Sequence, residues 1–256
     1  MKKDMKKKII VGNWKMNPIA LKEAMKIFSS VRRTASKLSS THVVICPPLL
    51  YVQKFASSRA VSPISIGAQN VFFEEQGHFT GEISSSMLKN IGVNHVIVGH
   101  SERREMGETD EIISKKVQAV LEMGIHPILC VGEKERDVHG LYLDVLKSQI
   151  KNSLAKTTKK LIGQVIMAYE PVWAIGAKEP MDPAIIQEMA IFVRKVISDM
   201  FGHENAMKTL VLYGGATNFR NASDIINLGK VDGLLVGRES VNVPGFVELL
   251  KAVDAV

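Results

Sequence analysis

The sequence predicts an α/β protein built as a single (β/α)8 barrel with eight parallel strands. Eight short, mostly β-branched apolar runs recur along its 256 residues, and helical patterns separate most of them. The runs are apolar throughout and do not alternate with polar residues, which is typical of strands covered on both faces. Eight strand and helix units fit a barrel, typically about 250 residues long, better than an open doubly wound sheet.

The apolar runs define the expected strands. Their residues are 9–11, 43–45, 64–66, 96–98, 128–131, 165–168, 210–212 and 234–236. Because strands that alternate with helices form parallel sheets, we expect all eight to run in the same direction.

Three of the intervening helices have clear signals. The first keeps Leu21, Met25, Phe28 and Ala35 on one face. The second keeps Ile113, Val117, Val120 and Leu121 on one face, with Thr109 or Asp110 as its cap and Gly124 as its stop. The third opens at Asp182-Pro183, a capping residue followed by proline at the first helical position.

Nothing divides the chain into smaller units. It has no Pro/Gly/Ser-rich linker, low-complexity tract or close internal repeat. We therefore expect one domain over residues 1–256, in which the basic segment 1–7 is frayed.

Two cysteines, Cys46 and Cys130, give no disulfide framework, which favours a reducing cytosol and a cytoplasmic protein.

Composition argues against several function classes. The formal charge is +7, but beyond the N-terminal lysine cluster the basic residues are spread out and lack interleaved aromatics, so we expect no nucleic-acid partner. No apolar stretch approaches the roughly 20 residues that span a bilayer, so we expect no membrane partner. No HExxH, paired CxxC or EF-hand pattern occurs, so we expect no metal.

Candidate site residues follow the expected strands, because catalytic groups of such barrels collect at the carboxyl ends of the strands. Asn13 and Lys15 follow the first strand, His100 the fourth and Glu170 the sixth. Turns rich in small residues follow the last two strands, and their backbone N–H groups suit a phosphate. These turns are Tyr213-Gly214-Gly215-Ala216 and Val236-Gly237-Arg238.

Glu170 lies between a buried strand and a segment that ends at Met181, with Pro171 and Gly176 around an apolar patch centred on Trp173. That arrangement suits a catalytic base under a loop that closes and expels water. The residues alone equally fit a surface glutamate before an ordinary turn. Likewise Lys15 alone fits a solvated lysine, His100 a structural histidine, and Cys130 a packed thiol.

Taken together, the motifs resemble the triosephosphate isomerase family, in order and over nearly the whole chain. They are Gly12-Asn13-Trp14-Lys15-Met16-Asn17, Gly67-Ala68-Gln69-Asn70, Val98-Gly99-His100-Ser101-Glu102-Arg103-Arg104, residues 168–176 and Tyr213-Gly214-Gly215. The resemblance implies the TIM-barrel fold and interconversion of dihydroxyacetone phosphate and glyceraldehyde 3-phosphate through an enediolate. It implies no cofactor and a place in glycolysis and gluconeogenesis.

The resemblance also implies the role of each site residue. Glu170 is the base, His100 the electrophile, Lys15 and Asn13 contact substrate, and Glu102 is a supporting carboxylate. The family is the standard example of a catalytic histidine that is kept neutral by the N-terminus of a helix. The resemblance therefore implies that His100 is neutral and that a helix begins at Ser101. The remaining expected substrate-binding positions are Gly176, Ala216, Gly237 and Arg238. The loop 69–82 implies a homodimer, in which it inserts beside the neighbouring subunit's Asn13 and Lys15.

Four departures from the family pattern affect the phosphate grip and the closing loop. Ala216 replaces a serine and Arg238 a glycine, while the stretch after Arg104 is one residue shorter than usual. The second hinge reads Lys178-Glu179-Pro180-Met181 in place of a Lys-Thr-Ala-like sequence.

These departures leave two alternatives to an isomerase. One is an aldolase-type lyase, in which Lys15 forms a Schiff base with the same ketone. The other is a phosphosugar-binding or scaffold protein without turnover, although binding alone does not require Glu170.

Overall fold

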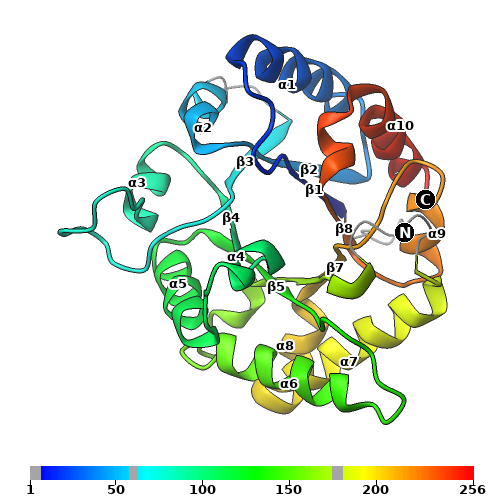
Figure 1. The fold of residues 1–256 in the computed structure, drawn as a ribbon. Coiled ribbons are helices and arrows are strands. Elements are labelled where there is room, and N and C mark those ends of the chain that lie inside the picture. The colour runs from blue at the N-terminus through cyan, green and yellow to red at the C-terminus, as the bar shows by residue number, and fades with distance from the viewer. Residues whose placement is uncertain (1–6, 58–62, 175–180) are drawn as a thin grey trace.

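The computed structural model describes residues 7–57, 63–174 and 181–256 and confirms the predicted barrel. Its parallel strands close in chain order from β1 to β8, and β8 pairs back to β1 (Figure 1). The strands are β1 (Lys8–Asn13), β2 (Thr41–Cys46), β3 (Ile64–Ala68), β4 (His95–Val98), β5 (His126–Val131), β6 (Ile166–Tyr169), β7 (Leu210–Tyr213) and β8 (Gly233–Val236).

Seven of the predicted runs lie wholly within the observed strands, and the sixth begins one residue before its strand. The sixth run was expected from residue 165, but β6 begins at Ile166. Val165 instead ends the preceding 3-10 turn, η2 (Ile162–Gln164), because its N–H donates to the carbonyl of Ile162 at 3.0 Å.

Continuous apolar runs arise because each strand has two buried faces. In β2, Val43 and Ile45 pack into the large core between barrel and helices. Val44 and Cys46 point the opposite way and pack into the barrel interior. The interior core comprises Ile9, Val11, Val44, Cys46, Ile97, Ile128, Cys130, Ile166, Ala168, Leu212 and Leu235.

Helices surround the barrel as an outer ring (Figure 1). They are α1 (Leu21–Ala35), α2 (Leu49–Ala56), α3 (Ser85–Asn90), α4 (Ser101–Glu105), α5 (Asp110–Glu122), α6 (Leu141–Ser153), α7 (Pro183–Phe201), α8 (His203–Lys208), α9 (Ala222–Asn227) and α10 (Val243–Asp254). Short 3-10 turns occur at η3 (Val172–Ala174) and η4 (Arg238–Val241). Among the described residues, no helix combines the length and apolarity needed to cross a bilayer.

The expected helix starts are confirmed for α5 and α7. Thr109, rather than Asp110, caps α5, since its hydroxyl accepts the N–H of Ile112. Asp182 caps α7 by accepting the N–H of Ala184 at 2.9 Å. The predicted face of α1 is only partly correct. Phe28 and Ala35 are buried, but Leu21 in the first turn is 48% exposed.

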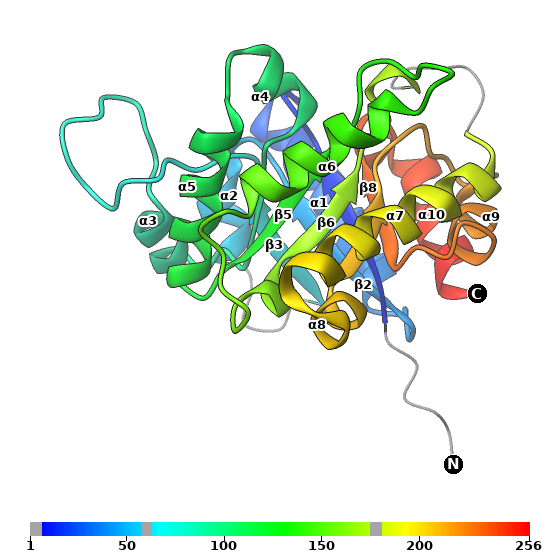
Figure 2. The ribbon, with the colours of Figure 1, turned by 90° about the horizontal axis from the view of Figure 1, so that it is seen from below.

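The two ends of the barrel differ in their connections. Figure 2 shows the barrel from the side, with α4 at the end where the strands finish. The connection from β3 to α3 projects away from the body in both views (Figures 1 and 2). Of the expected frayed segment 1–7, only Lys7, exposed just before β1, lies within the described residues, so the single domain over 1–256 stays a prediction.

Candidate active site

Glu170 stands just beyond β6 with its side chain on the inner face of the barrel. Ile166 and Ala168 belong to the interior core, and the two-residue period of a strand puts Glu170 on the same face. Only 3% of the residue is exposed. Two glycines make room for it. A Cβ on Gly132 would lie 1.7 Å from the Glu170 carbonyl oxygen, and one on Gly214 would lie 2.8 Å from its Cγ. The ends of β5 and β7 therefore fix this carboxylate from both sides.

His100 is buried and caps α4, which begins at Ser101 as expected. The backbone N–H of Glu102 donates to His100 Nδ1 at 3.2 Å, so Nδ1 presents a lone pair and the proton lies on Nε2. The carboxylate of Glu102 is 3.7 Å from Nδ1, too long for a competing hydrogen bond. His100 therefore accepts at Nδ1 and offers Nε2–H as a donor.

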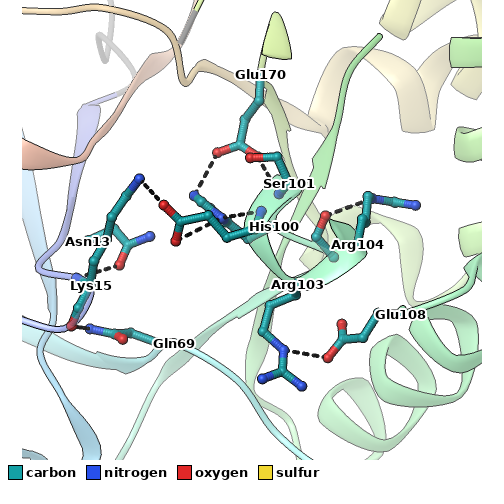
Figure 3. A network of polar contacts seen from close by, with 11 residues as sticks. Asn13, Lys15, Gln69, His100, Ser101, Arg103, Arg104, Glu108 and Glu170 are labelled. Carbon is teal, nitrogen blue, oxygen red and sulfur yellow. Dashed lines mark hydrogen bonds and ion pairs between the residues drawn. The ribbon is translucent and has the colours of Figure 1, made fainter. Parts of the chain in front are cut away.

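The His100 donor and the start of α4 both face Glu170. His100 Nε2 lies 3.1 Å from Glu170 Oε1, and the Ser101 N–H donates to Oε2 at 3.2 Å. Figure 3 shows the imidazole and the carboxylate pointing toward each other. Both carboxylate oxygens thus have a hydrogen-bond donor, which fixes the orientation of the side chain.

Lys15 approaches the site from the β1 to α1 connection. Its backbone has φ of 53°, a left-handed conformation uncommon outside glycine. Two side chains hold it there: its N–H donates to Asn13 Oδ1 at 3.0 Å, and Gln69 Nε2 donates to its carbonyl at 2.8 Å (Figure 3). Lys15 Nζ pairs with Glu102 Oε1 at 2.5 Å. This ion pair places Lys15 Nζ near His100, because the other oxygen of Glu102 lies 3.7 Å from His100 Nδ1.

One cavity of about 490 Å³ joins these residues to the two phosphate turns. It is lined by Asn13, Lys15, His100, Glu102, Glu170, Ala216, Gly237 and Arg238, together with neighbouring residues of the same connections. The structure therefore brings together every expected site residue except Gly176, which lies outside the described residues. Residues 178–180 of the second hinge also lie outside them, whereas Met181 is buried.

The turn after β7 offers free donors to an anion. Within the described part of the chain, the backbone N–H groups of Gly215 and Ala216 make no hydrogen bond. Gly215 has no room for a side chain, because a Cβ would lie 2.2 Å from the Tyr213 hydroxyl. In the turn after β8, Ser240 Oγ donates to the Gly237 carbonyl at 2.6 Å and fixes that backbone beside Lys15.

Sequence reasoning did not identify the buried Glu133, which follows β5. Its Oε1 accepts from the Tyr169 hydroxyl at 2.8 Å, from Trp173 Nε1 at 2.9 Å and from Arg136 Nε at 2.9 Å. The Arg136 guanidinium lies 5.4 Å from the centroid of the Trp173 ring. Burial, and then Glu133, raise the pKa of Tyr169, which therefore keeps its donor proton. The available signal was a carboxylate beyond a buried strand, the same signal that identified Glu170.

Arg103 and Arg104 form ion pairs. Arg103 Nε contacts Glu108 at 2.6 Å, and Arg104 Nη1 contacts Asp110 at 2.6 Å. Cys130 lies in the interior core, where burial, and then Glu170, raise the pKa of its thiol well above the ordinary value. It is thus a packed thiol, as expected.

Comparison with known proteins points to one family. The sequence profile of the triosephosphate isomerase family matches residues 8–253. The protein named triosephosphate isomerase of Endomicrobium trichonymphae is 40% identical over 250 residues, covering 96% of this chain and 99% of the relative. That of Chloroherpeton thalassium is 38% identical over 252 residues, covering 98% and 100%. That of Fusobacterium nucleatum subsp. nucleatum is 41% identical over 250 residues, covering 97% and 99%.

Proposed function

The chain belongs to the triosephosphate isomerase family and interconverts dihydroxyacetone phosphate and glyceraldehyde 3-phosphate, and we propose that Glu170, His100 and Lys15 carry out this reaction. The observation that carries the assignment is the convergence of a buried carboxylate, a neutral imidazole N–H and an ammonium group in one cavity beside two anion-binding turns.

The reaction is a proton transfer between adjacent carbons. The Glu170 carboxylate takes the proton from the carbon next to the carbonyl, and the electron pair of that C–H bond moves to give an enediolate. Negative charge then develops on the former carbonyl oxygen, which His100 Nε2–H and the Lys15 ammonium stabilise. Glu170 returns the proton to the former carbonyl carbon, while the hydroxyl proton passes from the neighbouring oxygen to the former carbonyl oxygen beside His100. The atoms and electrons therefore balance without an external oxidant or cofactor.

The hydrogen bonds of Glu170 imply a rearrangement on binding. Its two oxygens are engaged by His100 and Ser101, whereas a base needs a free oxygen facing the substrate carbon. The substrate displaces Glu170 from His100, and the released Nε2–H then donates to the substrate oxygen. Asn13, 5% exposed at the end of β1, orients Lys15 for the same oxygens.

The phosphate is bound at the turns after β7 and β8. The free N–H groups of Gly215 and Ala216, the Gly237 turn, Lys15 and the exposed Arg238 line this end of the cavity. For Gly176, which lies outside the described residues, a substrate contact is proposed from the family resemblance alone. Arg238 supplies a cation where the family pattern has a glycine, which offsets the hydroxyl that Ala216 lacks.

The Lys15 ion pair favours an isomerase over an aldolase-type lyase. A Schiff base requires the lysine nitrogen to attack the ketone, whereas Lys15 Nζ is engaged by Glu102 at 2.5 Å. A coupled assay that follows dihydroxyacetone phosphate formed from glyceraldehyde 3-phosphate tests the site. Turnover in the native chain and its loss in Glu170→Gln are expected, and an active Glu170→Gln enzyme would disprove the assignment.

The protein that binds the phosphorylated triose is a homodimer. Phe79 in the projecting loop is 43% exposed, and Met16 and Ile19 in the β1 to α1 connection are 91% and 96% exposed. The Gln69 hydrogen bond to Lys15 makes these two connections neighbours. Apolar groups gathered on one edge favour a subunit interface formed by loop 69–82.

Sedimentation tests the dimer. Met16→Asp is expected to give a monomer, because it places a charge in the interface without disturbing buried packing. Val138→Asp is the matched control. Val138 is as exposed as Met16, at 94%, but it lies in the connection after β5 and outside the proposed interface. A Met16→Asp protein that sediments as the native dimer would refute this interface.

The buried free thiols Cys46 and Cys130 support a reducing, cytoplasmic location, which cell fractionation tests.

A further inference from the structure

Gln149, in the third turn of α6, is not part of the cavity but holds the chain beside it. The Gly132 N–H donates to Gln149 Oε1 at 3.0 Å, and Gln149 Nε2 donates to the Gly132 carbonyl at 3.1 Å. Gly132 lies just beyond the end of β5, where the strand pairing to β6 has finished. The side-chain amide therefore supplies both hydrogen bonds that a neighbouring strand would give.

Gly132 in turn sets the position of Glu170. The ideal Cβ position of Gly132 is 1.7 Å from the Glu170 carbonyl oxygen, so the two backbones are in direct contact. The residue before Gly132 continues the link, since Glu170 N–H donates to the Val131 carbonyl at 2.8 Å. A displacement of Gly132 is thus transmitted to the peptide group that carries the Glu170 side chain.

We propose that Gln149 is a positioning residue for the isomerisation, acting on Glu170 through Gly132. The inference rests on the proposed role of Glu170 as the base. Misplacement of a catalytic group by about 1 Å can cost roughly 10²-fold in rate, so a remote amide that fixes the backbone is a sensitive point for turnover. Within the described residues, both side-chain hydrogen bonds of Gln149 go to Gly132 and none to the phosphate turns, so we expect substrate binding to be unaffected.

The chemistry of the amide makes the proposal specific. Gly132 requires one acceptor and one donor, and a glutamine side chain offers both at this reach. Methionine has a similar shape but lacks a donor and a strong acceptor. An ionised glutamate at position 149 keeps the acceptor for the Gly132 N–H, but its second oxygen repels the Gly132 carbonyl oxygen. A protonated glutamate has an O–H group that again donates to this carbonyl.

The first experiment compares Gln149→Met with Gln187→Met. Gln187 is a half-buried helical glutamine on α7 whose side chain makes no hydrogen bond to the described residues. In Gln149→Met we expect kcat to fall about tenfold or more, with KM and inhibition by inorganic phosphate within twofold of the native values. Gln187→Met should keep the native kcat. A native kcat in Gln149→Met, or a raised KM at unchanged kcat, would overturn the proposal.

The second experiment uses pH and remains decisive if the methionine variant does not fold. The kcat of Gln149→Glu divided by that of the native enzyme should rise as pH is lowered toward protonation of the new carboxyl, because Gly132 regains its donor. A ratio that does not change with pH would overturn the proposal. An active Glu170→Gln would instead overturn the role of the base, so the two failures are distinguishable.

Discussion

At the scale of single residues, the proposed role of Glu170 as the base predicts that the reach of its side chain determines the rate. Glu170→Asp withdraws the carboxylate by about one methylene while keeping its charge, and such a displacement costs about 10²-fold. We expect kcat to fall at least that far, with inhibition by phosphoglycolate within a few-fold. Glu188→Asp, an exposed carboxylate of α7, is the control and should keep native kinetics. Unchanged turnover in Glu170→Asp would show that another group removes the proton.

We expect Lys15 to act by its charge and not by forming a covalent bond, because its side chain pairs with Glu102. Lys15→Met removes an ionised donor to the substrate and should weaken binding by about 1.5 to 3 kcal/mol, with a fall in turnover. Inhibitor titration measures this loss, and Lys151→Met on the exposed face of α6 should show none. Borohydride treatment of the native enzyme with dihydroxyacetone phosphate should give no lysine adduct. An adduct in the mass spectrum would favour the aldolase.

Ala216 and Arg238 determine how firmly the phosphate is held. Ala216→Ser adds a hydroxyl beside free backbone N–H groups and should tighten phosphoglycolate binding by about 0.5 to 1.5 kcal/mol, the net value of one neutral hydrogen bond. If affinity stays flat because Arg238 already fills that role, Arg238→Gly should weaken it. Calorimetry on both variants measures the difference. Native affinity in both would mean that the phosphate binds elsewhere.

At the scale of elements, a buried ion cluster joins α5 to two connections at the site. Lys116 Nζ, only 3% exposed, contacts Glu108 at 2.5 Å and Asn70 at 2.8 Å, and Glu108 also pairs with Arg103. Burial lowers the pKa of Lys116, with Glu108 acting in the opposite direction. Glu108 therefore supports the charged form of this buried lysine.

Lys116→Met leaves Glu108 buried without its closest cation. Breaking a buried pair costs about 3 to 5 kcal/mol, so we expect a loss of that size in the free energy of unfolding by urea. Lys115→Met is the matched control, because the neighbouring Lys115 pairs with Glu111, which is exposed on the surface. Equal losses in the two variants would show that the cluster contributes nothing beyond a surface pair.

The sequence predicts elements well where one residue carries the signal. Asp182 and Pro183 predict the start of α7 because capping and proline geometry are local. The sequence does not show the left-handed backbone of Lys15, because that conformation depends on Gln69, which follows β3, as well as on the nearby Asn13. Nor does it show the partners of Glu133 and Gln149, which meet them only when β5, β6 and α6 pack together.

At the scale of the whole molecule, the two ends of the barrel interior carry different chemistry. Side chains alternate between the two faces of a strand, and this alternation predicts which residues face the active-site end of the barrel. Asn13 and Glu170 continue the inward-facing positions of β1 and β6 beyond the interior core. The opposite end was not anticipated. There His42, Ser65, His95 and His126 occupy inward positions at the starts of β2 to β5. His42 Nε2 lies 3.0 Å from Ser65 Oγ, and the ring of His95 lies 5.4 Å from that of His126.

This histidine cluster makes stability depend on pH. Burial, and then His126 and His42, lower the pKa of His95 to about 3, from 6.5 for a free histidine, and its Nδ1 is buried without a partner. Burial, and then Lys7, also lower the pKa of His42. Between pH 6.5 and 3 the unfolded chain binds a proton at residue 95 that the folded chain refuses. Acid therefore favours the unfolded state in that window, and the effect is absent above it.

His95→Gln tests this linkage, because glutamine is polar but does not titrate. Each pH unit below the unfolded pKa costs about 1.4 kcal/mol, so at pH 5 His95 destabilises the fold by roughly 2 kcal/mol relative to pH 7. In urea unfolding, the native chain should lose about that much more between pH 7 and pH 5 than His95→Gln does. His203→Gln, at an exposed position of α8, should lose as much as the native chain. Equal acid losses in the native and His95→Gln proteins would mean that the cluster accepts protons while folded, and that acid sensitivity arises elsewhere.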